Sequence, residues 1–278
     1  MPRNNEERLG TQDEGQTPPP TTSDSKSLLN FIVPTEFVEL PTKGLFYSSD
    51  HPLHNIDSIE IKHMTAKETD ILTSKTLLKK GVAIDRMLQS LIVESDIKVE
   101  NLFSGDKNAL TIAARKSGFG EEYSASITCT NCAATFEEEF DLNDVEVKEV
   151  DDDFKFTDEG TFFVELPQTK VTVECKLLTS SDEKKLLALM EKRQKLKLPE
   201  SSLTDQYKTF VVSLNGVTER GAVEEFIDLM PARDANYLRK EYEKARPDVD
   251  LSHVSDCPSC NAVVQVDIPF TVNFFWPK

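Results

Sequence analysis

The pattern of hydrophobic and polar positions changes several times along the chain, and each change marks a predicted element. From Phe31 to Tyr47, apolar pairs are interrupted by two prolines and a glycine, which predicts an extended arm rather than a helix. Residues 58–64, SIEIKHM, then alternate apolar and polar side chains as a β-strand does. The ordered part of the chain is therefore expected to begin with extended backbone.

A helical segment is predicted over residues 65–120. It opens with one helix that starts at a capping box at Thr65 and would end at Gly81, and the amphipathic stretches 82–94 and 105–120 predict two further helices. Asp106 stands where it would cap the last of these helices, and glycines near its end would stop it. The buried faces of these helices are expected to pack against one another.

The period then changes from helix to strand. Residues 121–140 alternate on both sides of a Cys-Thr-Asn-Cys turn, the pattern of a β-hairpin. Strands are also predicted within 160–178, helices within 180–245 (including 204–214), and the chain returns to strands after residue 250.

Four of the five cysteines form two Cys-x-x-Cys pairs, each between two predicted strands: Cys129, Cys132, Cys257 and Cys260. Two such knuckles facing each other complete the tetrahedral shell of a structural zinc site, and iron is the other metal that favours four thiolates. Redox activity would need a strand-to-helix setting that neither pair has, and four ordinary thiols are the remaining alternative. Cys175 lies in an alternating strand and is expected to be a small buried apolar residue.

These observations predict an α+β fold. Helical segments would surround a split zinc-ribbon-like hairpin module, and 124 residues of mixed α/β structure would be inserted between the knuckles. The predicted organisation is a disordered tail over 1–27, an extended arm and strand over 28–64, a helical segment over 65–120, a split zinc ribbon over 121–140 and 250–278, and inserted strands and helices over 141–249.

Charge and hydropathy narrow the class of protein. A net charge of −17 argues against nucleic-acid binding, which needs a basic surface. Residues 133–160 hold twelve acidic and two basic residues, a net of −10, which indicates either a solvated hairpin and linker or a docking surface for a basic partner. No apolar run approaches the roughly 20 residues that span a bilayer, and the first residues have no apolar signal core, so a cytoplasmic protein without membrane contact is expected.

The sequence contains no recognisable catalytic motif. It has no phosphate-binding glycine loop, no nucleophile elbow and no metalloprotease helix signature. The pair His51 and His54 is interrupted by a proline and is expected to lie in a polar turn, and His253 is a weak substitute ligand for the metal. We therefore expect a protein that is not an enzyme.

Residues 65–132, with the arm motif LPTKGLFY before them and FFWP near the end of the chain, resemble the baseplate-hub proteins of T-even-like contractile-tailed phages. That family includes hub components and hub assembly factors. The resemblance implies a non-enzymatic morphogenesis protein whose partners are other baseplate hub proteins. It would act in the host cytoplasm during phage assembly or within the tail baseplate of the virion, with its oligomeric state left open. The zinc site is predicted from the cysteines of this sequence and not from the resemblance.

Exposed aromatic and aliphatic residues of the arm and the C-terminal motif are candidate partner contacts: Phe37, Leu40, Leu45, Phe46, Tyr47, Phe274, Phe275 and Trp276. The alternatives are that the arm folds back on its own core and that the terminal aromatics pack as a strand of the ribbon. Two other functions compete with the hub role. One is a zinc-ribbon adaptor that binds a host or viral transcription complex, and the other is a hub-associated peptidoglycan hydrolase.

Overall fold

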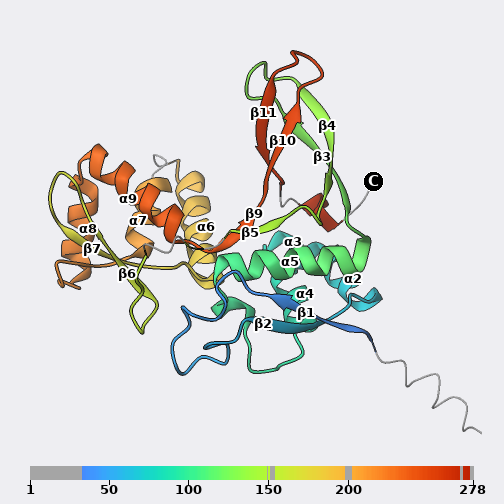
Figure 1. Cartoon of the computed structure of the whole chain (residues 1–278), viewed down its shortest axis with the longest axis horizontal. Helices are drawn as coiled ribbons and strands as arrows, with labels where there is room; N and C mark the ends of the chain where they lie inside the picture. Colours follow the sequence, from blue (N-terminus) through green and yellow to red (C-terminus); the bar gives the residue numbers. More distant parts are fainter. Residues whose placement is uncertain (1–32, 149, 151–153, 198–201, 270–271, 276–278) are drawn as a thin grey trace, which may run out of the picture. The chain divides into compact units, whose positions relative to one another are not determined.

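The computed structural model describes residues 33–148, 150, 154–197, 202–269 and 272–275. The chain divides into two units, residues 1–34 and 35–278, and every element named below belongs to the second unit. The tail predicted over residues 1–27 lies outside the described residues. Within the described part, helices are mixed with small antiparallel sheets, which confirms the α+β class (Figure 1).

The first part of the second unit has a two-stranded sheet followed by helices. Its elements are β1 (Thr35–Glu39), β2 (Ser58–Lys62), α2 (Ala66–Thr73), α3 (Lys75–Lys79), α4 (Ala83–Leu91), the short 3-10 helix η2 (Val99–Asn101) and α5 (Ser104–Phe119). The capping box is present, since the Thr65 amide donates to Glu68 and the Thr65 side chain caps α2. The stretch predicted as one helix is divided into α2 and α3, because Ser74 has an extended backbone.

Asp106 does not cap α5, contrary to the sequence prediction. Phe103 occupies the N-cap position, and the fully buried Asp106 carboxylate instead accepts hydrogen bonds from the arm. The Thr42 amide and hydroxyl donate to it at 3.0 and 2.7 Å, and the Tyr47 hydroxyl donates at 2.6 Å. A buried carboxylate needs such donors, so this network holds the arm against α5.

The arm therefore folds back onto its own core. Leu40, Phe46 and Tyr47 are only 2–7% exposed, so these three predicted partner contacts are buried within the chain itself. Phe37 and Leu45, which are 71% and 59% exposed, are the arm residues of that prediction that remain accessible.

The C-terminal aromatics are also buried in the chain's own core. Phe274 and Phe275 lie in the 3-10 helix η3 (Val272–Phe275), not in the predicted strand, and are 1% and 2% exposed. The Phe274 ring packs against Tyr123 with centroids 4.9 Å apart, and its carbonyl accepts a 2.7 Å hydrogen bond from buried Arg115. Their burial removes both residues from the accessible contact surface, while Trp276 lies outside the described residues.

Most of the region between the knuckles forms a second core, to which Phe46 of the arm also contributes, whereas Val249 packs in the first core. The elements of this region are β5 (Glu146–Lys148), β6 (Thr161–Glu165), β7 (Thr172–Lys176), α6 (Ser180–Lys195), α7 (Ser202–Phe210), β8 (Val211–Leu214), α8 (Arg220–Leu229), α9 (Ala232–Ala245) and β9 (Asp248–Asp250). Strands β6, β7 and β8 form one antiparallel sheet, and β5 pairs with β9. The predicted helix over 204–214 ends at Phe210, because Val211–Leu214 pairs with β7 as a strand.

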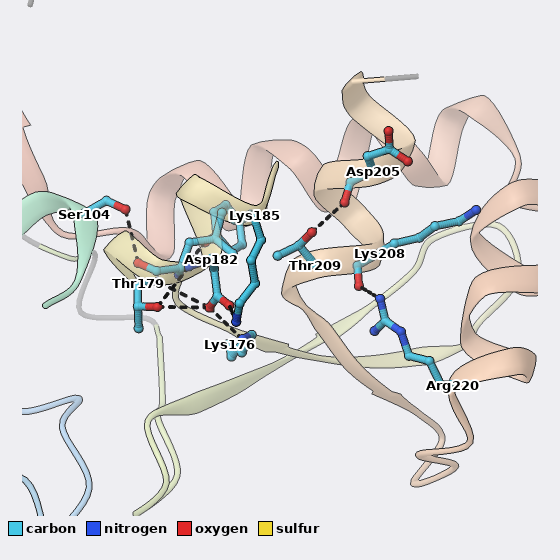
Figure 2. A network of polar contacts seen from close by, with 11 residues as sticks. Ser104, Lys176, Thr179, Asp182, Lys185, Asp205, Lys208, Thr209 and Arg220 are labelled. Carbon is cyan, nitrogen blue, oxygen red and sulfur yellow. Dashed lines mark hydrogen bonds and ion pairs between the residues drawn. The ribbon is translucent and has the colours of Figure 1, made fainter. Parts of the chain in front are cut away.

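Polar contacts join α6 to the preceding strand and to the helical part. Thr179 and Asp182 form a capping box at the start of α6, and Asp182 also accepts from Lys176 at 2.7 Å and Lys185 at 3.5 Å (Figure 2). The Ser104 hydroxyl at the start of α5 donates to the carbonyl of Leu178, just before this cap. These bonds connect the first helical core with the inserted one.

No helix in the described part of the chain is both long enough and apolar enough to cross a membrane.

Candidate metal centre

The two Cys-x-x-Cys motifs lie at the ends of two β-hairpins. Strands β3 (Glu122–Thr128) and β4 (Thr135–Asp141) pair antiparallel, as do β10 (Ser252–Asp256) and β11 (Val263–Asp267). Both hairpins place their connecting loops at the same end (Figure 1). Alternating apolar and polar residues form these strands, as the sequence pattern predicted.

The two loops have the same backbone hydrogen bonds. In the first, the Cys129 amide donates to the Ala134 carbonyl at 2.8 Å and the Ala133 amide donates to the Cys129 carbonyl at 2.9 Å. In the second, the Cys257 amide donates to the Ala262 carbonyl at 3.0 Å, and the Asn261 amide to the Cys257 carbonyl at 2.8 Å. Ala133 and Asn261, each four residues after the first cysteine, both have positive φ, at 57° and 54°.

This repeated geometry brings the four sulfurs together. The Sγ atoms of Cys129 and Cys260 are 3.8 Å apart, as are those of Cys132 and Cys257. All four Sγ atoms lie within 4.8 Å of one another. Among the residues that the structure describes, this is the one group of three or more His, Cys, Asp and Glu side chains with ligand atoms this close.

The sulfur separations fit a metal ion. In a tetrahedral site with Zn–S bonds of about 2.3 Å, the sulfurs are about 3.8 Å apart. A disulfide would instead require about 2.05 Å between sulfurs, and all four thiols are free. The four cysteines can therefore hold one metal ion, with two ligands from each hairpin.

Hydrogen bonds in the loops stabilise thiolates. The Asn131 side-chain amide donates to Cys260 Sγ at 3.5 Å, and together with the Ala262 amide it lowers the pKa of Cys260 to about 6. The pKa of Cys129 is also lowered, first by the backbone amide of Cys132. For Cys132 a backbone amide acts to lower the pKa, but the neighbouring sulfurs, Cys260 first, raise it to about 12. A bound cation would replace the protons of these thiols.

Burial differs across the site. Cys129 and Cys257 are buried against Val264, whereas Cys260 is half-buried and Cys132 is exposed. The cluster therefore has an apolar inner side and a solvent-facing side, which gives an ion a path to the sulfurs.

Histidines do not contribute to this cluster. The His253 Nε2 lies 3.3 Å from Glu138 and its ring packs edge-on against Phe140, so it is not a ligand of the site. His51 and His54 lie in a turn, where His51 accepts from the Leu53 amide, as the sequence predicted for a polar turn. Cys175 is separate from the four cysteines and fully buried, and burial raises the pKa of its thiol.

Sequence reasoning did not find three polar residues that organise the structure. Asn131 bonds a cysteine of the other hairpin, and Arg115 donates to three backbone carbonyls. Asp234, buried at the start of α9, accepts from the amides of Gln168 and Thr169. Asn131 could have been noticed from its position within a Cys-x-x-Cys turn. Arg115 and Asp234 could not, because each bonds to residues that are distant in the sequence.

Comparison with known proteins identifies the family. A family model described as T4 bacteriophage base plate protein matches residues 36–276. Comparisons with curated proteins and with solved structures gave no significant match. The matched span includes both hairpins, the helical part and the inserted region, so the match covers most of the chain. The chain belongs to the T4 bacteriophage base plate protein family.

Proposed function

We propose that this chain is a non-enzymatic protein of the baseplate hub of a contractile-tailed phage, acting as a minor hub subunit or as a hub assembly factor. The family match over residues 36–276 carries the proposal, because it implies a place in the phage tail and contacts with other baseplate proteins. The resemblance of residues 65–132 to hub proteins supports the finer assignment to the centre of the baseplate. Assembly would begin in the host cytoplasm.

Zinc is the proposed metal, and its role is structural. The four thiolates of Cys129, Cys132, Cys257 and Cys260 would fill a tetrahedral shell and leave no open position for a substrate. The ion would connect two hairpins that are separated by 124 residues in the sequence and would complete a split zinc ribbon. Holding the hairpins together is its proposed contribution to a surface that other hub proteins recognise.

Of the predicted contact residues that the structure describes, Phe37 and Leu45 are the ones that a partner could reach without unfolding the arm. Phe37 projects from β1, which pairs on one edge with β2. A large exposed aromatic side chain is a frequent anchor in protein interfaces. We therefore propose Phe37 as the first contact residue to test.

The transcription-adaptor alternative has less support. The exposed face of β4 next to the first knuckle carries Glu137, Glu139 and Asp141. A nucleic-acid-binding ribbon would need basic side chains there instead. The hydrolase alternative predicts lytic activity of the purified chain on bacterial cell walls.

The deciding experiment is deletion of the gene from the phage. We expect tails without a completed baseplate hub, restored when the intact chain is supplied from a plasmid but not when the Cys257→Ser/Cys260→Ser variant is supplied. Quantifying the chain in purified finished tails then separates a subunit, which is present, from an assembly factor, which is absent. Normal infectious tails from the deletion phage would contradict the hub role.

A further inference from the structure

Most side chains of α6 beyond Leu186 are exposed, although Arg193 is half-buried and its guanidinium pairs with Asp205. The large apolar side chains among them are 40–61% exposed: Leu187, Leu189, Met190 and Leu196. Several large apolar side chains exposed on one helix are uncommon in a monomer and mark interaction sites. Leu196 is the C-cap residue, so the exposed portion extends to the end of the helix.

Positive charge accompanies these leucines. Lys185, Leu189, Lys192 and Leu196 follow one another at intervals of four, three and four residues, which places them on one helical face. We name these four residues the α6 stripe. The stripe contains two lysines and no acid, although the whole chain carries a net charge of −17. Lys185 is 73% exposed even while its Nζ lies 3.5 Å from Asp182.

The second hairpin carries a surface of opposite charge. On β10 and β11 the exposed side chains lie on one face, which we name the outer hairpin face: Ser252, Val254, Asp256, Val263, Gln265 and Asp267. Val254 and Val263 are 65% and 70% exposed, and they are diagonal neighbours because Val254 pairs with Gln265 and Asp256 with Val263. None of these six side chains is basic, and two are acidic.

We propose that the α6 stripe of one copy of the chain binds the outer hairpin face of a second copy. Leucines would cover the two exposed valines, and lysines would face Asp256 and Asp267. The two surfaces differ, so the contact is heterologous: a bound pair still has one free stripe and one free hairpin face, which allows a ring or a longer chain of copies. The inference goes beyond the proposed hub role and does not depend on it.

The α6 stripe and the outer hairpin face are complementary in charge and are both exposed on this chain, which favours a second copy of the chain as the partner of each surface. Each surface offers two apolar and two charged side chains, which is a small contact. Small contacts with exposed charges give weak association that salt screens. The pairing is therefore expected to depend on protein concentration and to weaken at high salt.

Sedimentation velocity of the purified full chain tests the proposal. One variant, Leu189→Glu/Lys192→Glu, reverses the stripe, and another, Val254→Lys/Asp267→Lys, reverses the hairpin face. We expect the intact chain to self-associate at low salt and each variant alone to associate at least tenfold more weakly. Control variants Lys75→Glu/Lys79→Glu and Asp158→Lys/Glu159→Lys change exposed charges elsewhere and should associate as the intact chain does.

A mixture of the two variants gives the sharpest result. The stripe variant keeps an intact hairpin face and the hairpin variant keeps an intact stripe, so an equimolar mixture should form pairs and should associate more strongly than either variant alone. An unchanged metal content and melting midpoint would show that both variants fold. An intact chain that stays monomeric at every concentration, folded variants that associate normally, or a mixture without pairs would overturn the proposal.

Discussion

Arg115 donates its Nε hydrogen to the main-chain carbonyl of Phe274, 2.7 Å away and 159 positions later in the chain. The same fully buried guanidinium donates to the carbonyls of Gly120 and Glu122. One side chain of α5 thereby fixes the end of its own helix, the start of β3 and the C-terminal aromatic turn. The planar guanidinium is suited to this task because it presents several donors in a fixed arrangement.

Replacing Arg115 with alanine should destabilise the fold strongly. The buried carbonyl of Phe274 and the partly buried carbonyls of Gly120 and Glu122 would lose their donor. An unsatisfied buried group costs about 1–3 kcal/mol, so we expect the free energy of unfolding to fall by about 2 kcal/mol or more. Arg115→Lys should recover only part of the lost stability, since an ammonium group cannot donate to all three carbonyls in the arrangement of the guanidinium. Urea denaturation measures both, with exposed Arg86→Ala as the control. A loss below about 1 kcal/mol for Arg115→Ala would contradict this role.

Asp182 should make stability depend on acid pH. Burial acts to raise the pKa of its carboxyl, but the hydrogen bond and charge of Lys176 and the Thr179 amide lower it by more, so the net pKa is lowered. The unfolded chain then binds more protons in acid. The stabilising contribution is complete above a pH of about 4 and is lost as the pH falls through the lower folded-state value.

The Asp182→Asn variant tests this pH dependence. At neutral pH we expect it to be less stable by up to about 1 kcal/mol, because the carboxylate charge that pairs with Lys176 is lost, and this deficit should shrink as the pH falls below about 4. Urea denaturation over a pH series measures the difference, and exposed Asp70→Asn is the control. A deficit that stays constant down to acid pH would contradict the assignment.

Two glycines of α5 should respond differently to alanine. A Cβ on Gly105 would lie 2.2 Å from the Pro247 carbonyl oxygen, a backbone atom, whereas on Gly118 it would meet the flexible side chain of Met64 at 2.8 Å. Alanine favours a helix over glycine by about 1 kcal/mol. Gly105→Ala should nevertheless destabilise by about 2 kcal/mol or more, while Gly118→Ala should stay within about 1 kcal/mol of the original. Equal melting midpoints for the two variants would refute the close approach at Gly105.

Metal removal should uncouple the hairpins. We expect about one metal ion per chain by elemental analysis, lost in Cys257→Ser/Cys260→Ser together with a fall of roughly 10 °C or more in the melting midpoint. Cys175→Ala should keep the metal, because that thiol is outside the cluster. Visible absorption distinguishes the two candidate metals: an iron–thiolate site is coloured, whereas a zinc site is colourless. Metal-free protein with an unchanged melting transition in the double variant would refute the site.

Phe37 and Phe46 should differ in what they affect. Phe46→Ala removes a buried ring and should cost about 3–5 kcal/mol of stability. Phe37→Ala removes an exposed ring, so stability should change by less than about 0.5 kcal/mol while binding to hub proteins weakens. Affinity capture of hub proteins from infected cells by each tagged variant measures the binding. Full capture by Phe37→Ala would remove this residue from the proposed contact surface.

Local patterns predicted much of the fold and of the site. The capping box at Thr65, the alternating strands around Cys129 and Cys257, and the chelating spacing of the cysteines all depend on residues within a few positions of one another. Each motif can therefore be recognised in the sequence without knowledge of the rest of the fold.

Contacts between residues that are distant in the sequence could not be predicted from such local patterns. Val211–Leu214 continues an apolar helical pattern and becomes a strand only because β7 lies beside it. Aspartate is a common N-cap residue, but the carboxylate of Asp106 instead accepts hydrogen bonds from Tyr47 and Thr42 of the arm, 59 and 64 positions away in the sequence. The aromatic residues of the arm and of the C-terminal turn looked accessible because the sequence does not show which core covers them.

The two cores of the chain also differ in when their members are made on the ribosome. The inserted core draws on Phe46 and on residues between Phe162 and Ala245, so its last side chain is synthesised before the second hairpin. The first core joins Leu40 to Phe275 and stays incomplete until those final aromatics emerge from the exit tunnel. The inserted core can thus fold first during synthesis, whereas the first core, which includes the N-terminal helices, cannot be completed until Phe274 and Phe275 have been made.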